Sequence, residues 1–308
     1  MIVYNAEPFA YSSEAIRLWK SFGYDYREGS WDQLLEASFA SDATILIVRL
    51  AKKVDEAVLD KFPKLEQIFS ATTGHDHIDE SEIHCRNIKL VSLRGHDEFL
   101  RTIPSTAEHT WALLMSLYRN IPKANQHVLE GGWNRDLFRG YQLQNKVLGI
   151  IGYGRTGRKV SHYARAFGMK IIYFDPFVTE DLERKRTTLT EVFAEADILS
   201  FHVHLSDQTE KMLNAENISY LNDDCYLINT SRGKVWDETV VVTALRQKKI
   251  AGVAVDVLSE EMDKNKRSPL RDALKDGHNV IITPHIGGAT WDAISSCEEF
   301  LVRNALVK

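Results

Sequence analysis

Short apolar runs alternate along most of the chain with stretches in which apolar positions recur at helical spacing. Runs of this length, rich in β-branched residues, are typical of strands buried on both faces of a parallel sheet. They predict strands at 44–48, 67–70, 88–92, 147–151, 170–174, 197–203, 225–229, 251–257 and 280–283. Since strands and helices alternate, the pattern indicates an α/β protein built from doubly wound parallel sheets.

One predicted helix, at 105–120, is apolar on more than one face. The sequence favours Ser105 as its N-cap, with Glu108 completing a capping box, and Pro122 as its end. Large side chains such as Trp111 leave little room for a solvated side. The helix should therefore be buried between domains or against a second subunit. A homodimer accounts for this pattern, and an internal core helix is the alternative that stays open.

Composition narrows the possible partners. The 308 residues suffice for about two domains, and a hydrophobic content of 44% suffices for a core in each. A net charge of −5 without a basic block argues against nucleic acid and against an anionic membrane surface. No apolar run is long enough to span a membrane, and the N-terminus lacks a signal sequence, so we expect a cytoplasmic protein. Three scattered cysteines indicate neither disulfides nor a metal site.

The strand predicted at 147–151 leads directly into a glycine pattern, G-x-G-x-x-G, formed by Gly152, Gly154 and Gly157. The first glycine permits a tight turn, the second lets the backbone approach a pyrophosphate, and the third lets the next helix pack closely on the strand. The helix N-terminus would then face the phosphates. Three glycines in an ordinary α/β loop, or the glycine turn of a methyltransferase, are the alternatives.

An acidic residue strengthens the nucleotide interpretation. Asp175 directly follows the strand predicted at 170–174. A carboxylate at the end of this second strand accepts hydrogen bonds from the adenosine ribose hydroxyls and repels a 2′-phosphate. The sequence therefore favours NAD as the cofactor over NADP.

Three further residues, Arg232, Glu261 and His285, each follow a predicted strand, where open α/β sheets place their ligands. Taken singly, each has an ordinary explanation as a surface ion-pair partner, a solvated carboxylate or a polar loop residue. Together they suit hydride transfer to a 2-oxo acid. A guanidinium can bind the substrate carboxylate by paired hydrogen bonds, a histidine can give or take the proton, and a carboxylate can orient its ring.

At this point the chain resembles the D-isomer-specific 2-hydroxyacid dehydrogenases. The resemblance rests on STAEHT, LGIIGYGRTG, HVHLSDQT, NTSRGKVWDE, GVAVDVLSEE and TPHIGGAT, which occur in the order found in that family. It implies an NAD-dependent enzyme that interconverts a D-2-hydroxy acid and its 2-oxo acid, with Arg232 on the carboxylate and His285, paired with Glu261, as general acid/base. It also implies that the NAD site includes Arg155, Thr156, Asp175, Thr230, Ser231, Asp256 and Gly288 besides the three glycines.

The same resemblance implies two domains. A Rossmann NAD-binding domain would occupy 99–286, and a flavodoxin-like substrate domain would occupy 1–98 plus 287–308. Substrate would bind in the cleft between them.

Substrate identity is less defined. Thr73, Gly74 and His75 match the family's substrate-carboxylate loop, although spacing alone is equally compatible with a simple turn. Arg49 stands where phosphoglycerate-type relatives bind phosphate, so a phosphoglycerate dehydrogenase is one specific possibility; a surface arginine at a strand end is an equally good interpretation. An NAD(H)-sensing protein, like corepressors of the same family, is a rival function, but binding alone does not require a proton donor such as His285.

Overall fold

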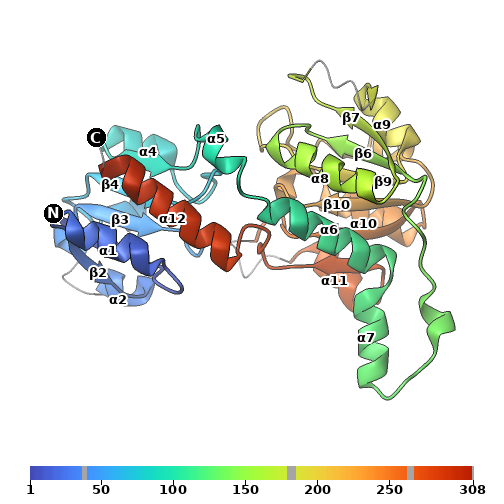
Figure 1. The fold of residues 1–308 in the computed structure, drawn as a ribbon, viewed down its shortest axis with the longest axis horizontal. Coiled ribbons are helices and arrows are strands. Elements are labelled where there is room, and N and C mark those ends of the chain that lie inside the picture. Colours follow the sequence, from blue (N-terminus) through green and yellow to red (C-terminus); the bar gives the residue numbers. More distant parts are fainter. Residues whose placement is uncertain (37–39, 179–184, 262–266, 307–308) are drawn as a thin grey trace. The chain divides into compact units, whose positions relative to one another are not determined.

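The computed structural model describes residues 1–36, 40–178, 185–261 and 267–306. It divides into two compact units (Figure 1). Unit 1 comprises Met1–Thr102 with Ala289–Lys308, and unit 2 comprises Ile103–Gly288. The chain thus passes from unit 1 into unit 2 after Thr102 and returns after Gly288. The division expected from the sequence places these two passages a few residues earlier, after 98 and after 286.

Unit 1 is built on a parallel sheet whose described strands have the order β2-β1-β3-β4-β5. This is the flavodoxin-like order expected from the sequence, so that part of the fold prediction is confirmed. The strands are β1 (Ile2–Asn5), β2 (Asp25–Glu28), β3 (Ile45–Val48), β4 (Gln67–Ser70) and β5 (Lys89–Ser92). The sequence pattern missed β1 and β2. The second is a short polar strand at the edge of the sheet, with no fully buried side chain to give an apolar signal.

Helices cover both faces of this sheet, and the alternation of side chains along β3 shows why. Ile45 and Ile47 pack on one face with Trp19 and Val302, whereas Leu46 and Val48 pack on the other. The helices of unit 1 are α1 (Ser13–Ser21), α2 (Trp31–Glu36), η1 (Ala40–Asp42), α3 (Glu56–Leu59), α4 (Glu80–Cys85), α5 (Asp97–Leu100) and α12 (Trp291–Leu306).

Unit 2 is built on a second parallel sheet, with the order β12-β11-β10-β9-β6-β7-β8 among the described residues. Numbered within the unit, this is the Rossmann order with one further strand at the β12 edge, so this part of the prediction is confirmed too. The strands are β6 (Val147–Ile151), β7 (Lys170–Phe174), β8 (Lys185–Arg186), β9 (Ile198–Phe201), β10 (Cys225–Asn229), β11 (Ile250–Val255) and β12 (Val280–Ile282).

Two apolar clusters lie on opposite faces of the sheet in unit 2. One joins α6 and α8 to Leu148, Ile150 and Ile228, and the other joins α9, α10 and α11 to Leu199 and Val253. The helices are α6 (Ser105–Tyr118), α7 (Ile121–Leu129), η2 (Arg135–Phe138), α8 (Arg155–Ala166), α9 (Leu189–Glu195), η3 (Ile218–Tyr220), η4 (Gly233–Val235), α10 (Glu238–Arg246) and α11 (Pro269–Lys275).

The ends of the predicted apolar helix differ from expectation. Pro104, not Ser105, is the N-cap of α6, and no side chain caps that end among the described residues. Ser105 is instead the first helical residue and is buried. Pro122 does not end a helix, because α6 stops at Tyr118 and Pro122 stands in the first turn of α7, where its missing N–H costs nothing.

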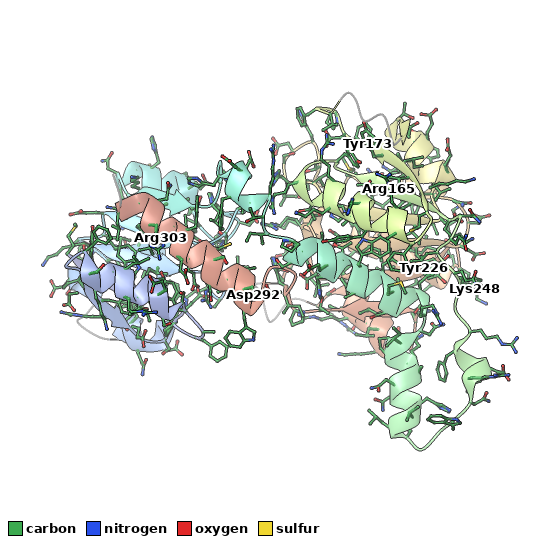
Figure 2. All side chains as sticks on the ribbon, viewed as in Figure 1. Arg165, Tyr173, Tyr226, Lys248, Asp292 and Arg303 are labelled. Atoms are coloured by element: carbon green, nitrogen blue, oxygen red, sulfur yellow. The ribbon has the colours of Figure 1, made fainter. Side chains whose placement is uncertain are left out.

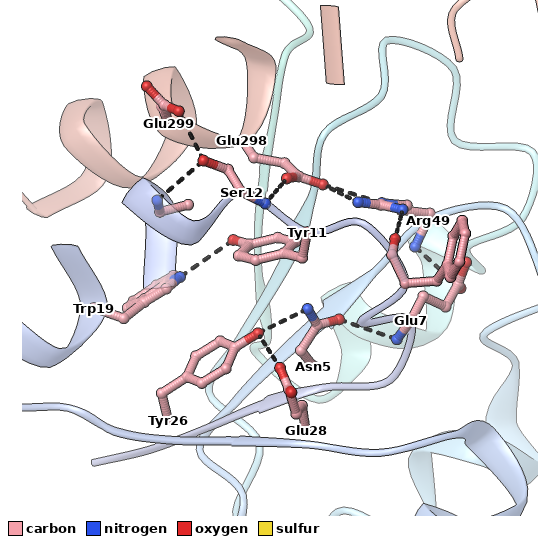
Figure 3. Close-up of polar contacts among 12 residues, drawn as sticks. Asn5, Glu7, Tyr11, Ser12, Trp19, Tyr26, Glu28, Arg49, Glu298 and Glu299 are labelled. Carbon is pink, nitrogen blue, oxygen red and sulfur yellow. Dashed lines mark hydrogen bonds and ion pairs between the residues drawn. The ribbon is translucent and has the colours of Figure 1, made fainter. Parts of the chain in front are cut away.

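The C-terminal helix α12 is tied to unit 1 by a buried ion pair (Figure 3). Glu298 on α12 accepts hydrogen bonds from Nε of Arg49 (3.1 Å) and from its Nη2, and from the backbone N of Ser12 (2.7 Å). Burial raises the pKa of the Glu298 carboxyl, and the Arg49 charge opposes that shift. At the other end of α12, Arg303 (labelled in Figure 2) donates to Glu14 of α1. Helix α12 is therefore an integral part of unit 1.

Removing one partner of the buried pair should destabilise unit 1. We expect Arg49→Leu to lower the free energy of unfolding by about 3 kcal/mol, because the Glu298 carboxylate would stay buried without its cation. The double variant Arg49→Leu/Glu298→Leu should recover much of the loss. Urea unfolding followed by circular dichroism measures both. If the single variant is as stable as the double, the pair does not anchor α12.

Candidate active site

The glycine turn between β6 and α8 has the geometry of a phosphate cradle. Gly152 has a φ of +89°, and a Cβ there would lie 2.5 Å from the carbonyl oxygen of His202. A Cβ at Gly157 would lie 2.2 Å from the carbonyl oxygen of Gly152, so these two positions exclude any side chain. Around Gly154, by contrast, the described residues place no atom within 4 Å of where a Cβ would be, its immediate chain neighbours and the backbone of α8 aside. The turn therefore leaves open space directly before the N-terminus of α8.

The first residues of α8 present the donors that an anion requires. Gly154 is the N-cap, and no described side chain caps this end, whereas Arg155 and Thr156 begin the helix. The amide groups of the first turn and the helix dipole thus point toward the open space. Because β6 and β9 meet where the strand order reverses, this space lies at the switch point of the sheet, where open α/β folds bind nucleotides.

Asp175 lies beside this turn at the end of β7. One carboxylate oxygen accepts a hydrogen bond from the backbone N of Tyr153 (2.7 Å), and the other accepts from Phe177 (2.8 Å) and Val178 (3.1 Å). These bonds fix an anionic group next to the glycine turn. It fits the ribose of NAD and would repel the extra phosphate of NADP.

After β10, the turn that carries Arg232 is shaped by Asn229. The side-chain oxygen of Asn229 accepts from the backbone N (2.9 Å) and the Oγ (2.7 Å) of Ser231, and its amide nitrogen donates to the carbonyl oxygen of Arg232 (2.9 Å). Thr230 is linked to Thr110 of α6 through their hydroxyl groups, 2.8 Å apart. The turn is thus held on both sides, and Arg232, which is half-buried and has an extended backbone, stands at its end as the N-cap of η4.

The Arg232 turn packs directly against the segment that leads to Glu261. A Cβ at Gly233 would lie 2.0 Å from the carbonyl carbon of Leu258, so only glycine fits. Glu238, a buried carboxylate on α10, accepts hydrogen bonds from the backbone N of Ser259 (2.6 Å) and from Oγ of Ser268 (2.8 Å). These contacts hold the segment after β11 against the turn after β10.

His285 and Glu261 form a direct pair. Nδ1 of His285 lies 2.6 Å from Oε1 of Glu261, and the other oxygen of Glu261 accepts from the backbone N of Leu258 (3.2 Å). Because an ionised carboxylate can only accept, Nδ1 carries the proton in this contact and Nε2 is the nitrogen that can meet a reacting oxygen. The two side chains are 27% and 28% exposed, so the pair is partly sheltered and still accessible.

Asp256 controls the backbone of the turn in which His285 stands. Its carbonyl oxygen accepts from the N of His285 (2.8 Å), and its two carboxylate oxygens accept from Ile286 (2.9 Å) and Gly287 (2.7 Å). Three consecutive amides thus donate to one residue. Burial favours the neutral acid, but the hydrogen bonds from His109, from Thr283 and from this backbone outweigh it and keep the pKa of Asp256 below its usual value.

The three residues expected to act together follow neighbouring strands. Arg232 comes after β10, Glu261 after β11 and His285 after β12, and these strands are adjacent and parallel. Their carboxyl ends therefore meet at one edge of the sheet. Gly288 lies at the same edge, and apart from its chain neighbours no atom of the described residues lies within 4 Å of where its Cβ would be, which leaves space for a flat ring.

The other predicted substrate residues lie in unit 1. Thr73 and Gly74 are half-buried in the turn after β4, and the hydroxyl of Thr72 donates to the carbonyl oxygen of Gly74 (2.9 Å). His75 is buried, with Nδ1 3.1 Å from Oε1 of Glu80, and burial lowers its pKa. Substrate binding by this turn stays a prediction.

Arg49, the fourth predicted substrate residue, is already engaged. Besides Glu298, its guanidinium donates to the carbonyl oxygen of Phe9 (2.8 Å). A substrate phosphate would have to compete with a buried ion pair for this cation. Sequence reasoning missed Glu298 because it lies far along the chain from Arg49.

Sequence reasoning also missed four residues that shape the site: Asn229, Glu238, Thr283 and His109. Asn229 carried a local signal, since asparagine two positions before a serine is typical of an Asx turn. The other three act through long-range contacts.

Among the described residues, no group of three or more His, Cys, Asp or Glu side chains is placed to hold a metal ion. None of the described helices is both long and apolar enough to cross a bilayer.

Fold and site together define a dinucleotide-binding α/β dehydrogenase. Residues 111–287 match the family model for the D-isomer specific 2-hydroxyacid dehydrogenase NAD-binding domain. The chain is 38% identical over 252 residues to D-3-phosphoglycerate dehydrogenase of Bacillus subtilis, covering 80% of this chain and 46% of that protein. It is 33% identical over 302 residues to glyoxylate reductase of Thermococcus litoralis, covering 94% and 86%.

Comparison with solved structures leads to the same family as the sequence comparisons. D-lactate dehydrogenase from Aquifex aeolicus, complexed with NAD and lactic acid, superposes with a TM-score of 0.81 at 27% identity, covering 99% of this chain and 94% of that one. The chain therefore belongs to the D-isomer specific 2-hydroxyacid dehydrogenase family, and the resemblance drawn from its motifs is confirmed. It binds NAD through unit 2. The chain spans less than half the length of the B. subtilis phosphoglycerate dehydrogenase.

Asp175 should set the preference between the two nicotinamide cofactors. We expect Asp175→Ser to weaken NADH binding about tenfold and to tighten NADPH binding, because the ribose loses its acceptor and the 2′-phosphate loses a repelling charge. Fluorescence titration with each cofactor gives both dissociation constants. An unchanged ratio of the two constants would contradict the placement of the ribose beside Asp175.

Proposed function

We propose that the protein reduces a small, unphosphorylated 2-oxo acid to the D-2-hydroxy acid with NADH, and catalyses the reverse reaction with NAD. The observation that carries the proposal is the 2.6 Å contact between Nδ1 of His285 and Oε1 of Glu261, at the sheet edge that also carries Arg232. A protein that only bound the cofactor would not need a histidine oriented in this way.

Each residue has a defined task in the proposed reaction. The guanidinium of Arg232 binds the carboxylate of the substrate by paired hydrogen bonds and polarises its carbonyl. The bound nicotinamide supplies the hydride to the carbonyl carbon. Nε2 of His285 donates a proton to the developing alkoxide oxygen, and in the reverse direction it removes the hydroxyl proton. Glu261 holds the ring in place through Nδ1.

The remaining cofactor contacts follow from positions in unit 2. We propose that Arg155 and Thr156 meet the pyrophosphate from the start of α8, while Thr230, Ser231, Asp256 and Gly288 lie at the nicotinamide end. The two carboxylate oxygens of Asp256 accept hydrogen bonds from Thr283, Ile286 and Gly287 of its own chain. Its part at that end is therefore to fix the backbone around His285.

The absence of phosphate from the proposed substrate rests on Arg49. Its guanidinium is held by the buried Glu298 and by the carbonyl oxygen of Phe9. The similarity to glyoxylate reductase over 94% of this chain supports the same choice. A phosphoglycerate dehydrogenase is the second candidate, favoured by the 38% identity to that enzyme of B. subtilis.

Replacing the proposed acid should abolish turnover and spare cofactor binding. We expect His285→Gln to lower kcat by a factor of about 10³, because the alkoxide loses its proton donor, while the dissociation constant for NADH stays within twofold. Stopped-flow absorbance gives the rate, and fluorescence titration gives the binding. A variant with near-normal turnover would falsify the assignment of His285.

We also propose that the protein is a homodimer that pairs through an arm formed by residues 121–141. The arm extends away from the body of unit 2 (Figure 1). Large apolar side chains are exposed along it, among them Trp133 at 90% and Leu129 at 73%. A monomeric soluble protein rarely exposes so much apolar surface in one short segment, and a second copy of the arm would cover it.

We propose a reducing, cytoplasmic location for the protein. The described cysteines, Cys85, Cys225 and Cys297, are free, which fits such a compartment.

Charge placed on the arm should separate the subunits. We expect Trp133→Glu to weaken dimerisation at least tenfold, because a carboxylate would lose its hydration in the interface. Phe9→Glu is the matched control, since Phe9 is similarly exposed (83%) but lies in unit 1. Sedimentation velocity of both variants and of the parent chain measures how strongly each one dimerises. A monomeric parent chain, or equal effects of both substitutions, would contradict pairing through the arm.

A further inference from the structure

His109, on α6, lies against the two groups that support the turn of His285. Its Nε2 is 2.9 Å from Oγ1 of Thr283 and 3.2 Å from Oδ1 of Asp256. The His109 side chain is 16% exposed, so these contacts are largely shielded from water. Nothing in the mechanism above uses His109.

The chemistry of the partners fixes the direction of these contacts. The hydroxyl of Thr283 donates to Oδ1 of Asp256 (2.6 Å), and the Asp256 carboxylate can only accept. Thr283 therefore offers His109 a lone pair, and so does Asp256. Nε2 of His109 must carry a hydrogen, and it shares that hydrogen between both oxygens.

The turn that this network supports is strained. His285 has a φ of +55°, in the left-handed region that residues with a side chain rarely adopt. The Asp256 carboxylate holds the two amides that follow His285, and its carbonyl oxygen holds the amide of His285 itself. If this carboxylate rotated, the turn could relax and move the imidazole. Nε2 of His109 and the Thr283 hydroxyl contact Oδ1, the same oxygen that accepts from the amide of Ile286, and so oppose such a rotation.

His109 also links the two places where the chain crosses between the units. Helix α6 begins shortly after the chain enters unit 2, and the turn of His285 ends at Gly288, where the chain leaves it. A Cβ at Gly287 would lie 3.5 Å from Cδ2 of His109 and 3.6 Å from Cγ2 of Thr106. The start of α6 and the end of the turn are therefore packed against each other within unit 2.

We propose that His109 is a positioning residue for the reaction: by donating from Nε2 to Asp256 and Thr283, it holds the turn in which His285 meets the substrate. This inference rests on the proposed function of His285. It assigns His109 no contact with substrate or cofactor, so its effect should fall on the chemical step and leave cofactor binding intact.

The test compares two amide replacements that differ only in reach. The side-chain nitrogen of His109→Gln can occupy the place of Nε2, whereas the nitrogen of His109→Asn is one bond too short. We expect kcat for reduction of the best 2-oxo acid to fall at least tenfold in the Asn variant and less than threefold in the Gln variant. The dissociation constant for NADH should stay within twofold in both. With NADH deuterated at C4, the isotope effect on kcat should rise in the Asn variant, because a displaced His285 makes the chemical step slower.

His278→Asn is the matched control. His278 is also half-buried in unit 2 but precedes β12, whereas Thr283 and His285 follow it at the opposite end of the strand. This control should leave kcat and the isotope effect unchanged.

Thr283→Val provides a second test. In the Thr283→Val background the hydrogen-bond network is already broken, so His109→Asn should lower kcat by a much smaller factor than it does in the parent protein.

Four outcomes would overturn the proposal: full activity of the Asn variant, equal losses in the Gln and Asn variants, a loss confined to NADH binding, or additive effects of His109→Asn and Thr283→Val. His285→Gln, measured in the same series, separates this failure from failure of the proposed function. If His285→Gln is inactive and His109→Asn is fully active, only the role of His109 is wrong. If His285→Gln is active, the role proposed for His285, on which this inference rests, is wrong.

Discussion

The constraint on which the site depends is the binding of three consecutive amides by Asp256. The amides of His285, Ile286 and Gly287 all donate to this one residue, and His285 adopts a left-handed backbone as a result. An imidazole on a freely moving loop could not stay 2.6 Å from the Glu261 carboxylate. Asp256 is buried and saturated with hydrogen bonds, whereas Glu261 is partly exposed and bonded to the imidazole. Two carboxylates after the same strand therefore have different tasks, one structural and one in the proposed proton transfer.

Two arginines show the same separation of tasks. Arg49 and Arg232 both stand at the end of a parallel strand, which is where ligands bind in such sheets. Arg49 is used by the protein itself, since its charge balances a buried carboxylate on α12 and so ties the C-terminal helix into unit 1. Arg232 stands at the end of a turn fixed by Asn229 and directly before Gly233. The first arginine supports the fold, and the second is the one that we propose binds the substrate.

Local patterns predicted most of this structure, and long-range contacts account for the rest. The strands at 147–151, 170–174 and 225–229 were predicted with their observed bounds, because buried parallel strands are continuous apolar runs. Polar β2 gave no such signal, and the helix start at Ser105 was misassigned because a capping pattern does not show which residue is already helical. Pairing of Arg49 with Glu298, and of His109 with Asp256, joins distant parts of the chain, which neither spacing nor composition reveals.

The proposed reaction can be tested by following the oxidation of NADH by the purified protein with a panel of 2-oxo acids: glyoxylate, hydroxypyruvate, pyruvate, 2-oxoglutarate and phosphohydroxypyruvate. We expect turnover of at least one unphosphorylated acid, with the D-hydroxy acid as the product. Phosphohydroxypyruvate should be a poor substrate. If the protein binds NADH but oxidises it with none of these acids, the proposed function is contradicted. Turnover confined to the phosphorylated acid would also contradict it, because Arg49 would then have to leave Glu298 to bind that acid.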